Sequence, residues 1–255
     1  MRIKTLGIAV LALLLAGAAG AAGKAAKPPL KIGHRGTRGL LDENTLESMK
    51  KAAGLGVDML EFDVQRTQDH VFVIMHDETV DRTTDGHGRI DQMPLAEFQA
   101  RKTKSGFHPP TLDEVLDWLG TNNLGFILDF KIPDPQSAED LLGVIEKRGL
   151  LKRAVFESPV PSIAGRVEKL KPEAVTAIYP TNQIAMVRLA DKNHIDQVSF
   201  NWHFATPGQV WLAHHRGHQV LVWTVDSRFL IHWFTRLHVD GIMTDDPNLF
   251  QPKKK

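Results

Sequence analysis

The chain has 255 residues, of which 42% are hydrophobic, and this is enough for one large domain with a well-buried core. Its formal net charge of +1 gives no sign of a protein that binds nucleic acid or a charged membrane surface. The absence of cysteine excludes disulfides, thiolate metal sites and a lipid-modified cysteine.

The N-terminal segment has the pattern of a secretory signal peptide. Arg2 and Lys4 precede an apolar run from Leu6 to Ala16, and small residues follow it. The run is too short for an ordinary membrane-spanning helix, although an uncleaved anchor is the alternative interpretation. We therefore expect residues 1–22 to be cleaved and residues 23–30 to form a linker. The mature protein would then be exported, periplasmic or secreted, without stable membrane insertion.

After this linker, strand-like and helix-like segments alternate. The expected strands, in chain order, are residues 30–36, 57–67, 125–131, 153–158, 174–180, 196–202, 218–226 and 239–247. The expected helices between them are residues 43–56, 111–120, 137–150, 161–171, 183–194, 206–217 and 227–238. After the second strand, a hairpin turn leads to a further extended run at 71–77. A polar insertion at 81–110 then contains one helical segment, at 94–102.

Strict alternation implies parallel strands joined by right-handed crossovers. Eight such units in roughly 230 residues fit a closed (β/α)₈ barrel, the TIM barrel of the α/β class. We place this barrel at residues 31–250, with a short insertion after the second strand and a solvated basic tail at 251–255. The alternative is an open doubly wound sheet, which is disfavoured because no Gly-rich dinucleotide turn follows the first strand.

Acidic residues lie inside two of the predicted strands. Glu61 and Asp63 have i, i+2 spacing, so their side chains point to the same face of the second strand. Two unpartnered acids on one buried face would repel each other and would be costly to remove from water. Asp129, near the end of the next barrel strand, adds a third carboxylate, and this ligand set favours Mg²⁺ or Ca²⁺ over Zn²⁺. The alternative is one exposed acid and one salt bridge.

Basic side chains and imidazoles accompany these acids at the predicted strand ends. Arg35 and Lys131 beside a metal would suit a phosphate or another multiply charged oxyanion. His34 and His76 are candidate general acid and base, because imidazole titrates at a pH of about 6.5. A single histidine near a strand end is more often structural. However, a structural role for each residue does not explain why six predicted strands all place polar residues near the same end of the barrel.

Motifs along the chain resemble those of the glycerophosphodiester phosphodiesterase family. They are GHRG at 33–36, ENT at 43–45, EFDVQRT at 61–67, HD at 76–77, DRTTDGHG at 81–88, LDFK at 128–131, WTVD at 223–226 and VDGIMTDDP at 239–247. The ordered set covers nearly the whole chain after the signal-like segment and is highly specific, although a single motif such as HRG is weak.

The resemblance implies a (β/α)₈ barrel with one divalent cation, Mg²⁺ or Ca²⁺. It also implies hydrolysis of a small glycerophosphodiester to an alcohol and glycerol 3-phosphate, with either water or the neighbouring glycerol hydroxyl as nucleophile. By position, the implied residues are Glu61, Asp63 and Asp129 for the metal, His34 and His76 for acid/base catalysis, and Arg35 and Lys131 for phosphate. Glu43 would lie near the metal or orient the first-strand loop, and Trp223 would contact the alcohol.

The chain departs from the family pattern in two places. The third acid is usually Glu, and Asp129 is one methylene shorter, so the metal would sit closer to that strand or be bridged by water. The insertion is shorter than usual around Phe107 and His108, which either replace part of a pocket wall or are ordinary loop residues. Two other functions stay open: a lipid phosphodiesterase that acts on lysophospholipids, and a barrel that binds phosphodiesters without turnover. The sequence predicts no particular oligomeric state.

We expect structural roles for a further group of histidines and for three of the tryptophans. We interpret the histidines within residues 214–218 as charge at a solvated helix end rather than as a metal site. Trp202, Trp211 and Trp233 are expected to pack in the core or between helices.

Overall fold

Eight parallel strands form a closed barrel, as predicted. The structure is a computed structural model that describes residues 27–252, so the predicted signal peptide and parts of the predicted linker and tail lie outside the described residues. The barrel strands are β1 (Leu30–Gly33), β2 (Met59–Arg66), β4 (Gly125–Phe130), β5 (Ala154–Ser158), β6 (Val175–Ile178), β7 (Gln197–Asn201), β8 (Gln219–Trp223) and β9 (Gly241–Thr244). Each strand pairs with its neighbours, and β1 pairs with both β2 and β9, which closes the ring.

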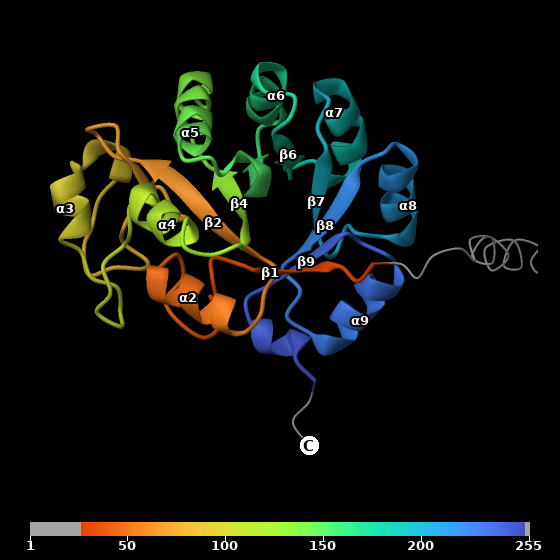
Figure 1. Ribbon diagram of the computed structural model, residues 1–255, viewed down its shortest axis with the longest axis horizontal. Coiled ribbons are helices and arrows are strands. Elements are labelled where there is room, and N and C mark those ends of the chain that lie inside the picture. Colours follow the sequence, from red (N-terminus) through yellow and green to blue (C-terminus); the bar gives the residue numbers. More distant parts are fainter. Residues whose placement is uncertain (1–26, 253–255) are drawn as a thin grey trace, which may run out of the picture.

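Helices surround the strands in Figure 1. They are α2 (Leu46–Gly54), α4 (Leu112–Leu119), α5 (Pro135–Lys147), α6 (Pro161–Leu170), α7 (Met186–Asn193), α8 (Pro207–His215) and α9 (Arg228–Arg236), with short 3₁₀ turns η2 (Leu151–Arg153), η3 (Gln183–Ala185) and η4 (Pro247–Phe250). Local sequence fixes several of the helix starts. Thr111, for example, caps α4, and Glu114 completes a capping box with it.

Alternation of side chains along each strand divides the core into two parts. Residues such as Phe62 and Phe126 point outward, where their rings stack with centroids 6.0 Å apart in the layer between strands and helices. The intervening residues point into the barrel, where Ile127 and Val155 belong to an apolar cluster. Residues two positions further along these strands, on the same face, lie above that apolar layer and are acidic. The interior of the barrel is thus apolar in its lower part and polar at the mouth, where the strands end.

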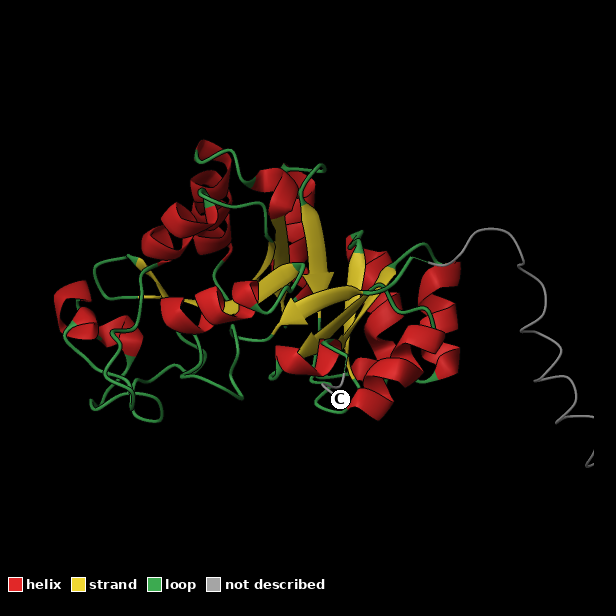
Figure 2. Ribbon diagram, turned by 60° about the horizontal axis from the view of Figure 1, so that its bottom comes forward, coloured by secondary structure: helices red, strands yellow, loops and turns green. Residues whose placement is uncertain are grey.

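The insertion forms a small unit of its own beside the barrel. β3 (Phe72–Ile74) pairs antiparallel with β2, and η1 (Ile90–Gln92) and α3 (Leu95–Gln99) follow. Figure 2 shows this part projecting to the left of the barrel. It has a satellite core that includes Val80 and Phe98. The predicted helix is present but shorter, and the 3₁₀ turn was not predicted.

Two predictions about the surface are wrong in part, although His214 and His215 are exposed in the last turn of α8 as predicted. Trp211 and Trp233 lie on α8 and α9 with 63% and 46% of their surface exposed, so they are not core residues. His218 is buried rather than solvated, and its ring bonds to Asp191 and to the carbonyl of Ile195. No helix among residues 27–252 is long and apolar enough to cross a membrane.

Candidate active site

Three buried carboxylates meet at the mouth of the barrel. Glu61 and Asp63 come from β2, and Asp129 comes from β4, where it is paired in register with Asp63. One oxygen from each lies within 4.8 Å of the others. Their exposed fractions are 2%, 1% and 6%, so the alternative with one solvent-exposed acid is wrong.

Backbone and amide donors hold the two acids of β2. The backbone N–H of Arg35 donates to Glu61 Oε2 at 2.8 Å. The side chain of Asn44 donates to Asp63 Oδ2 at 2.8 Å. Both donors come from the segment after β1, where Arg35 and Asn44 adopt positive φ values of 48° and 58°. The loop is therefore shaped around these acids.

Asp129 has partners of its own. The hydroxyl of Tyr179 lies 2.7 and 2.8 Å from its two oxygens, and Lys131 Nζ forms an ion pair with it. Lys131 Nζ also donates to the Tyr179 hydroxyl and lies 3.1 Å from Asp63 Oδ1, although that oxygen accepts no hydrogen bond. The ammonium of Lys131 thus lies beside two carboxylates, Asp63 and Asp129.

The electrostatics of this cluster favour a bound cation. Burial, followed by the charges of Asp63 and Asp129, raises the pKa of Glu61 well above its ordinary value. Burial raises the pKa of Asp129 to about 6. Burial also acts to raise the pKa of Asp63, but the charges of Lys131 and Arg35 outweigh it and lower that pKa. Buried carboxylate oxygens that repel one another fit a hard divalent cation such as Mg²⁺ or Ca²⁺.

The two predicted histidines line the same small pocket as Glu61 and Asp129, and this pocket has a volume of about 70 Å³. His34 Nδ1 lies 2.5 Å from Asp245 Oδ1, and its Nε2 lies 3.9 Å from Glu61 Oε2. His76 Nδ1 lies 2.6 Å from Asp77 Oδ1. A carboxylate at Nδ1 favours the tautomer with the proton there and leaves Nε2 for proton transfer.

An arginine network joins the insertion to the first-strand loop. Glu43 accepts from Arg35 at 2.8 Å and from both terminal nitrogens of Arg82 at 2.7 and 3.0 Å. Arg82 also donates to Asp77, the partner of His76, at 2.6 Å. Burial acts to raise the pKa of Glu43, but the arginines outweigh it and hold that pKa at about 2. Glu43 thus lies outside the group of three acids and links the first-strand loop to the insertion.

Aromatic side chains form the opposite wall of the pocket. Trp223 packs edge-to-face on Tyr179 with centroids 5.7 Å apart, and its indole N–H donates to the Ser199 carbonyl at 3.0 Å. Both aromatic residues also line a neighbouring hollow of about 320 Å³, together with Phe204. This hollow provides room beside the acids for a group larger than the central pocket admits.

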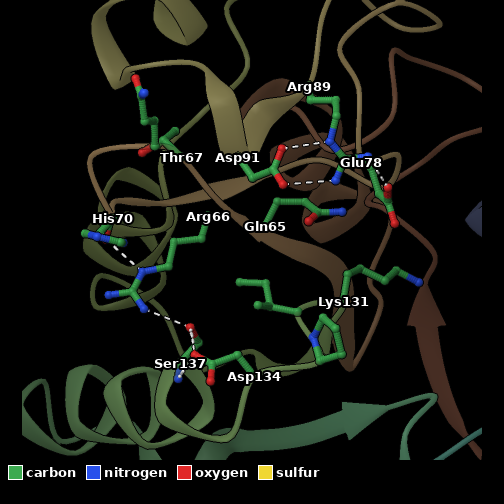
Figure 3. A pocket seen from close by; sticks show the side chains of 13 residues that line it. Gln65, Arg66, Thr67, His70, Glu78, Arg89, Asp91, Lys131, Asp134 and Ser137 are labelled. Atoms are coloured by element: carbon green, nitrogen blue, oxygen red, sulfur yellow. Dashed lines mark hydrogen bonds and ion pairs between the residues drawn. The ribbon is translucent and has the colours of Figure 1, made fainter.

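A second groove, of about 310 Å³, lies between the insertion and the segment that follows β4. Figure 3 shows its arginines engaged by neighbours: Arg89 bridges Asp91 and Glu78, and Arg66 donates to Ser137. Lys131 lines both this groove and the central pocket. Because both predicted histidines, Glu61 and Asp129 line the central pocket and not this groove, the central pocket is the better candidate for chemistry.

Two polar residues of the pocket had no predicted role. Tyr179, which ends a predicted strand, is the chain's only tyrosine. Glu157 is an acid inside a predicted buried strand, the same signal that identified Asp129, and it lines the pocket with 3% of its surface exposed. Burial, followed by the charge of Asp129, raises the pKa of Glu157 to about 8.

Comparison with known proteins agrees with this geometry. The model of the glycerophosphoryl diester phosphodiesterase family matches residues 34–249. A glycerophosphodiester phosphodiesterase from Caldanaerobacter subterraneus is 29% identical over 86% of this chain and 94% of its own. One from Bacillus subtilis is 28% identical over 89% of this chain and 86% of its own.

Solved structures have the same fold. A putative glycerophosphoryl diester phosphodiesterase from Silicibacter pomeroyi is 25% identical with a TM-score of 0.80, over 93% of this chain and 95% of its own. A phosphodiesterase from Oleispira antarctica, solved with its product sn-glycerol-3-phosphate, is 25% identical with a TM-score of 0.79. It covers 88% of this chain and 96% of its own.

Proposed function

The chain belongs to the glycerophosphoryl diester phosphodiesterase family, and on this basis we propose that it hydrolyses glycerophosphodiesters to an alcohol and glycerol 3-phosphate with one divalent cation and two histidines. The observation that carries the proposal is the meeting of three buried acids, two imidazoles and two basic side chains at the mouth of the barrel. Barrels of this kind carry their chemistry at that end of the strands.

Glu61, Asp63 and Asp129 would hold the cation, Mg²⁺ or Ca²⁺. When bound, it would polarise a phosphoryl oxygen and neutralise charge that develops in the transition state. Arg35 and Lys131 lie beside these acids and would bind the remaining phosphate oxygens. Their present partners include Asp63 and Asp129 of the cluster.

The two histidines would move the protons. One Nε2 accepts a proton from the attacking hydroxyl, which belongs to water or to the glycerol of the substrate, and the other Nε2 donates a proton to the leaving alcohol. Attack by water gives glycerol 3-phosphate directly. Attack by the glycerol hydroxyl gives a cyclic phosphate, which water then opens to glycerol 3-phosphate with the two histidines in exchanged roles. Asp245 and Asp77 hold the opposite ring nitrogens of His34 and His76 and keep each ring in place. Trp223 would contact the alcohol, because it lines both the central pocket and the neighbouring hollow.

A substrate panel tests this function. The purified protein is incubated with glycerophosphocholine, glycerophosphoethanolamine or lysophosphatidylcholine in Mg²⁺, Ca²⁺ or chelator, and glycerol 3-phosphate is measured. We expect release from the water-soluble diesters with a cation and none with chelator. Turnover of the lysophospholipid alone would instead support a lipid phosphodiesterase. Binding of a diester without any product in either cation would support a non-catalytic barrel.

Replacing Arg82 with alanine is expected to lower kcat by about tenfold to a hundredfold, because Asp77 then loses the partner that fixes it against His76. Initial rates on the best diester of the panel measure the effect. Arg82→Lys should restore part of the rate, since lysine supplies the charge but not the fork of donors.

Arg89→Ala is the matched control for Arg82. Its side chain is 44% exposed against 45% for Arg82, and it also bridges two carboxylates of the insertion, Asp91 and Glu78. It should leave kcat unchanged. Equal losses of kcat in both alanine variants would mean that any destabilisation of the insertion lowers activity. The positioning role of Arg82 would then be wrong.

We also propose that the enzyme is exported, periplasmic or secreted. The support is the charged start, short apolar run and small-residue exit of residues 1–22. The mass of the protein recovered from outside the cytoplasm tests this proposal. A full-length mass with the first residues intact would contradict cleavage.

A further inference from the structure

A fourth acid lies directly beside the proposed cation site. Glu157 on β5 is paired in register with Asp129 on β4, so its side chain enters the barrel at the same level. Glu157 lies two positions after Val155, so the two side chains share a face of β5. Val155 belongs to the apolar cluster of the barrel interior. Glu157 is therefore part of the polar mouth and not of the packing between strands and helices.

One oxygen of Glu157 has no partner. Its side chain is 3% exposed, and Oε1 is fully buried without a hydrogen bond. A buried carboxylate oxygen without a donor is costly and calls for an explanation. Glu157 lines the central pocket with Glu61 and Asp129, although it lies outside the group of three whose oxygens are within 4.8 Å of one another. Glu157 thus borders the site from the side of β5.

Asp129 is poorly suited to fill that side of the site alone. Both of its oxygens already lie within hydrogen-bond distance of the Tyr179 hydroxyl, and Lys131 is ion-paired to it. Its side chain is also short. Glu157, on the adjacent strand, has one methylene more, and its Oε1 is not engaged.

We propose that Glu157 is a fourth carboxylate of the cation site, which supports the cation on the β5 side, either as a ligand or through a water bound to the cation. The inference rests on the cation of the proposed function. Oxygen ligands are what Mg²⁺ and Ca²⁺ prefer, and outer carboxylates orient the groups and waters bound to a metal. Glu157 should therefore set how tightly the cation binds.

Direct binding of the cation tests this role without any measurement of activity. The mature protein is stripped with chelator and titrated with Mg²⁺ or Ca²⁺ alone by isothermal titration calorimetry. Glu157→Gln keeps the shape and a neutral polar group but removes the charge, and we expect its Kd to rise about 10- to 100-fold. Glu173→Gln, which changes an exposed acid before β6, should bind like the wild type.

A second variant and unfolding measurements control for an effect on folding. Glu157→Asp keeps the charge but withdraws it by one methylene, and it should also weaken binding. Unfolding curves without cation show that each variant is folded. If Glu157→Gln and wild type have Kd values within about twofold, Glu157 is a neutral structural acid and the inference is wrong, whereas the proposed function stands. If the wild type binds neither cation, the inference and the cation of the proposed function are both wrong.

Discussion

His34→Ala and His76→Ala are each expected to lower kcat by about 10²- to 10⁴-fold, the usual contribution of a positioned general acid or base. Both rings line the pocket of the acids, and each has a carboxylate at Nδ1. No other histidine lines that pocket among residues 27–252, so no neighbour can replace a lost imidazole. The measurement is the initial rate of glycerol 3-phosphate release.

The double variant gives a sharper result. Residues that act as one unit lose activity non-additively, so removal of both rings should cost little more than removal of one. His214→Ala is the control, because this histidine bonds to Asp240 on the outer surface of the barrel and should leave kcat unchanged. Full activity of either single variant would exclude the proposed acid/base pair, whatever the substrate.

The barrel was predictable because its signals are local. Strand and helix periods alternate along the chain, and each predicted barrel strand appears in the structure. The position of the acids was predictable for the same reason. The i, i+2 spacing of Glu61 and Asp63 places both side chains on one face of a single strand. The pairing of Asp63 with Asp129 then needed only the order of neighbouring strands.

Features that depend on packing between distant segments could not be predicted. Arg82 reaches Glu43 across 39 residues of sequence, and the link follows from how the insertion folds back on the first loop. Tyr179 reaches Asp129 across 50 residues. The exposure of Trp211 depends on the face that α8 turns outward. The residue type alone suggested that Trp211 is packed in the core or between helices.

A saturating cation is expected to raise the Tm of the protein by about 5–10 °C. A ligand at 100 times its Kd stabilises a folded protein by about 2.7 kcal/mol, and a domain of this size gains about 2–4 °C per kcal/mol. The physical reason is that the cation neutralises three buried carboxylates that otherwise repel one another. Thermal unfolding with chelator, Mg²⁺ or Ca²⁺ measures the shift, and Asp63→Asn should lose most of it.

The effect of the cation should also depend on pH. Without cation, burial raises the pKa of Asp129 from 3.8 to about 6, so the folded state keeps a proton that the unfolded state releases earlier. The contribution of this proton to stability is present below about pH 4 and is lost as the pH rises through about 6. The cation binds the deprotonated carboxylate, so the rise in Tm should be larger at about pH 8 than at about pH 5. Equal shifts at both pH values would show that protons do not compete for this site.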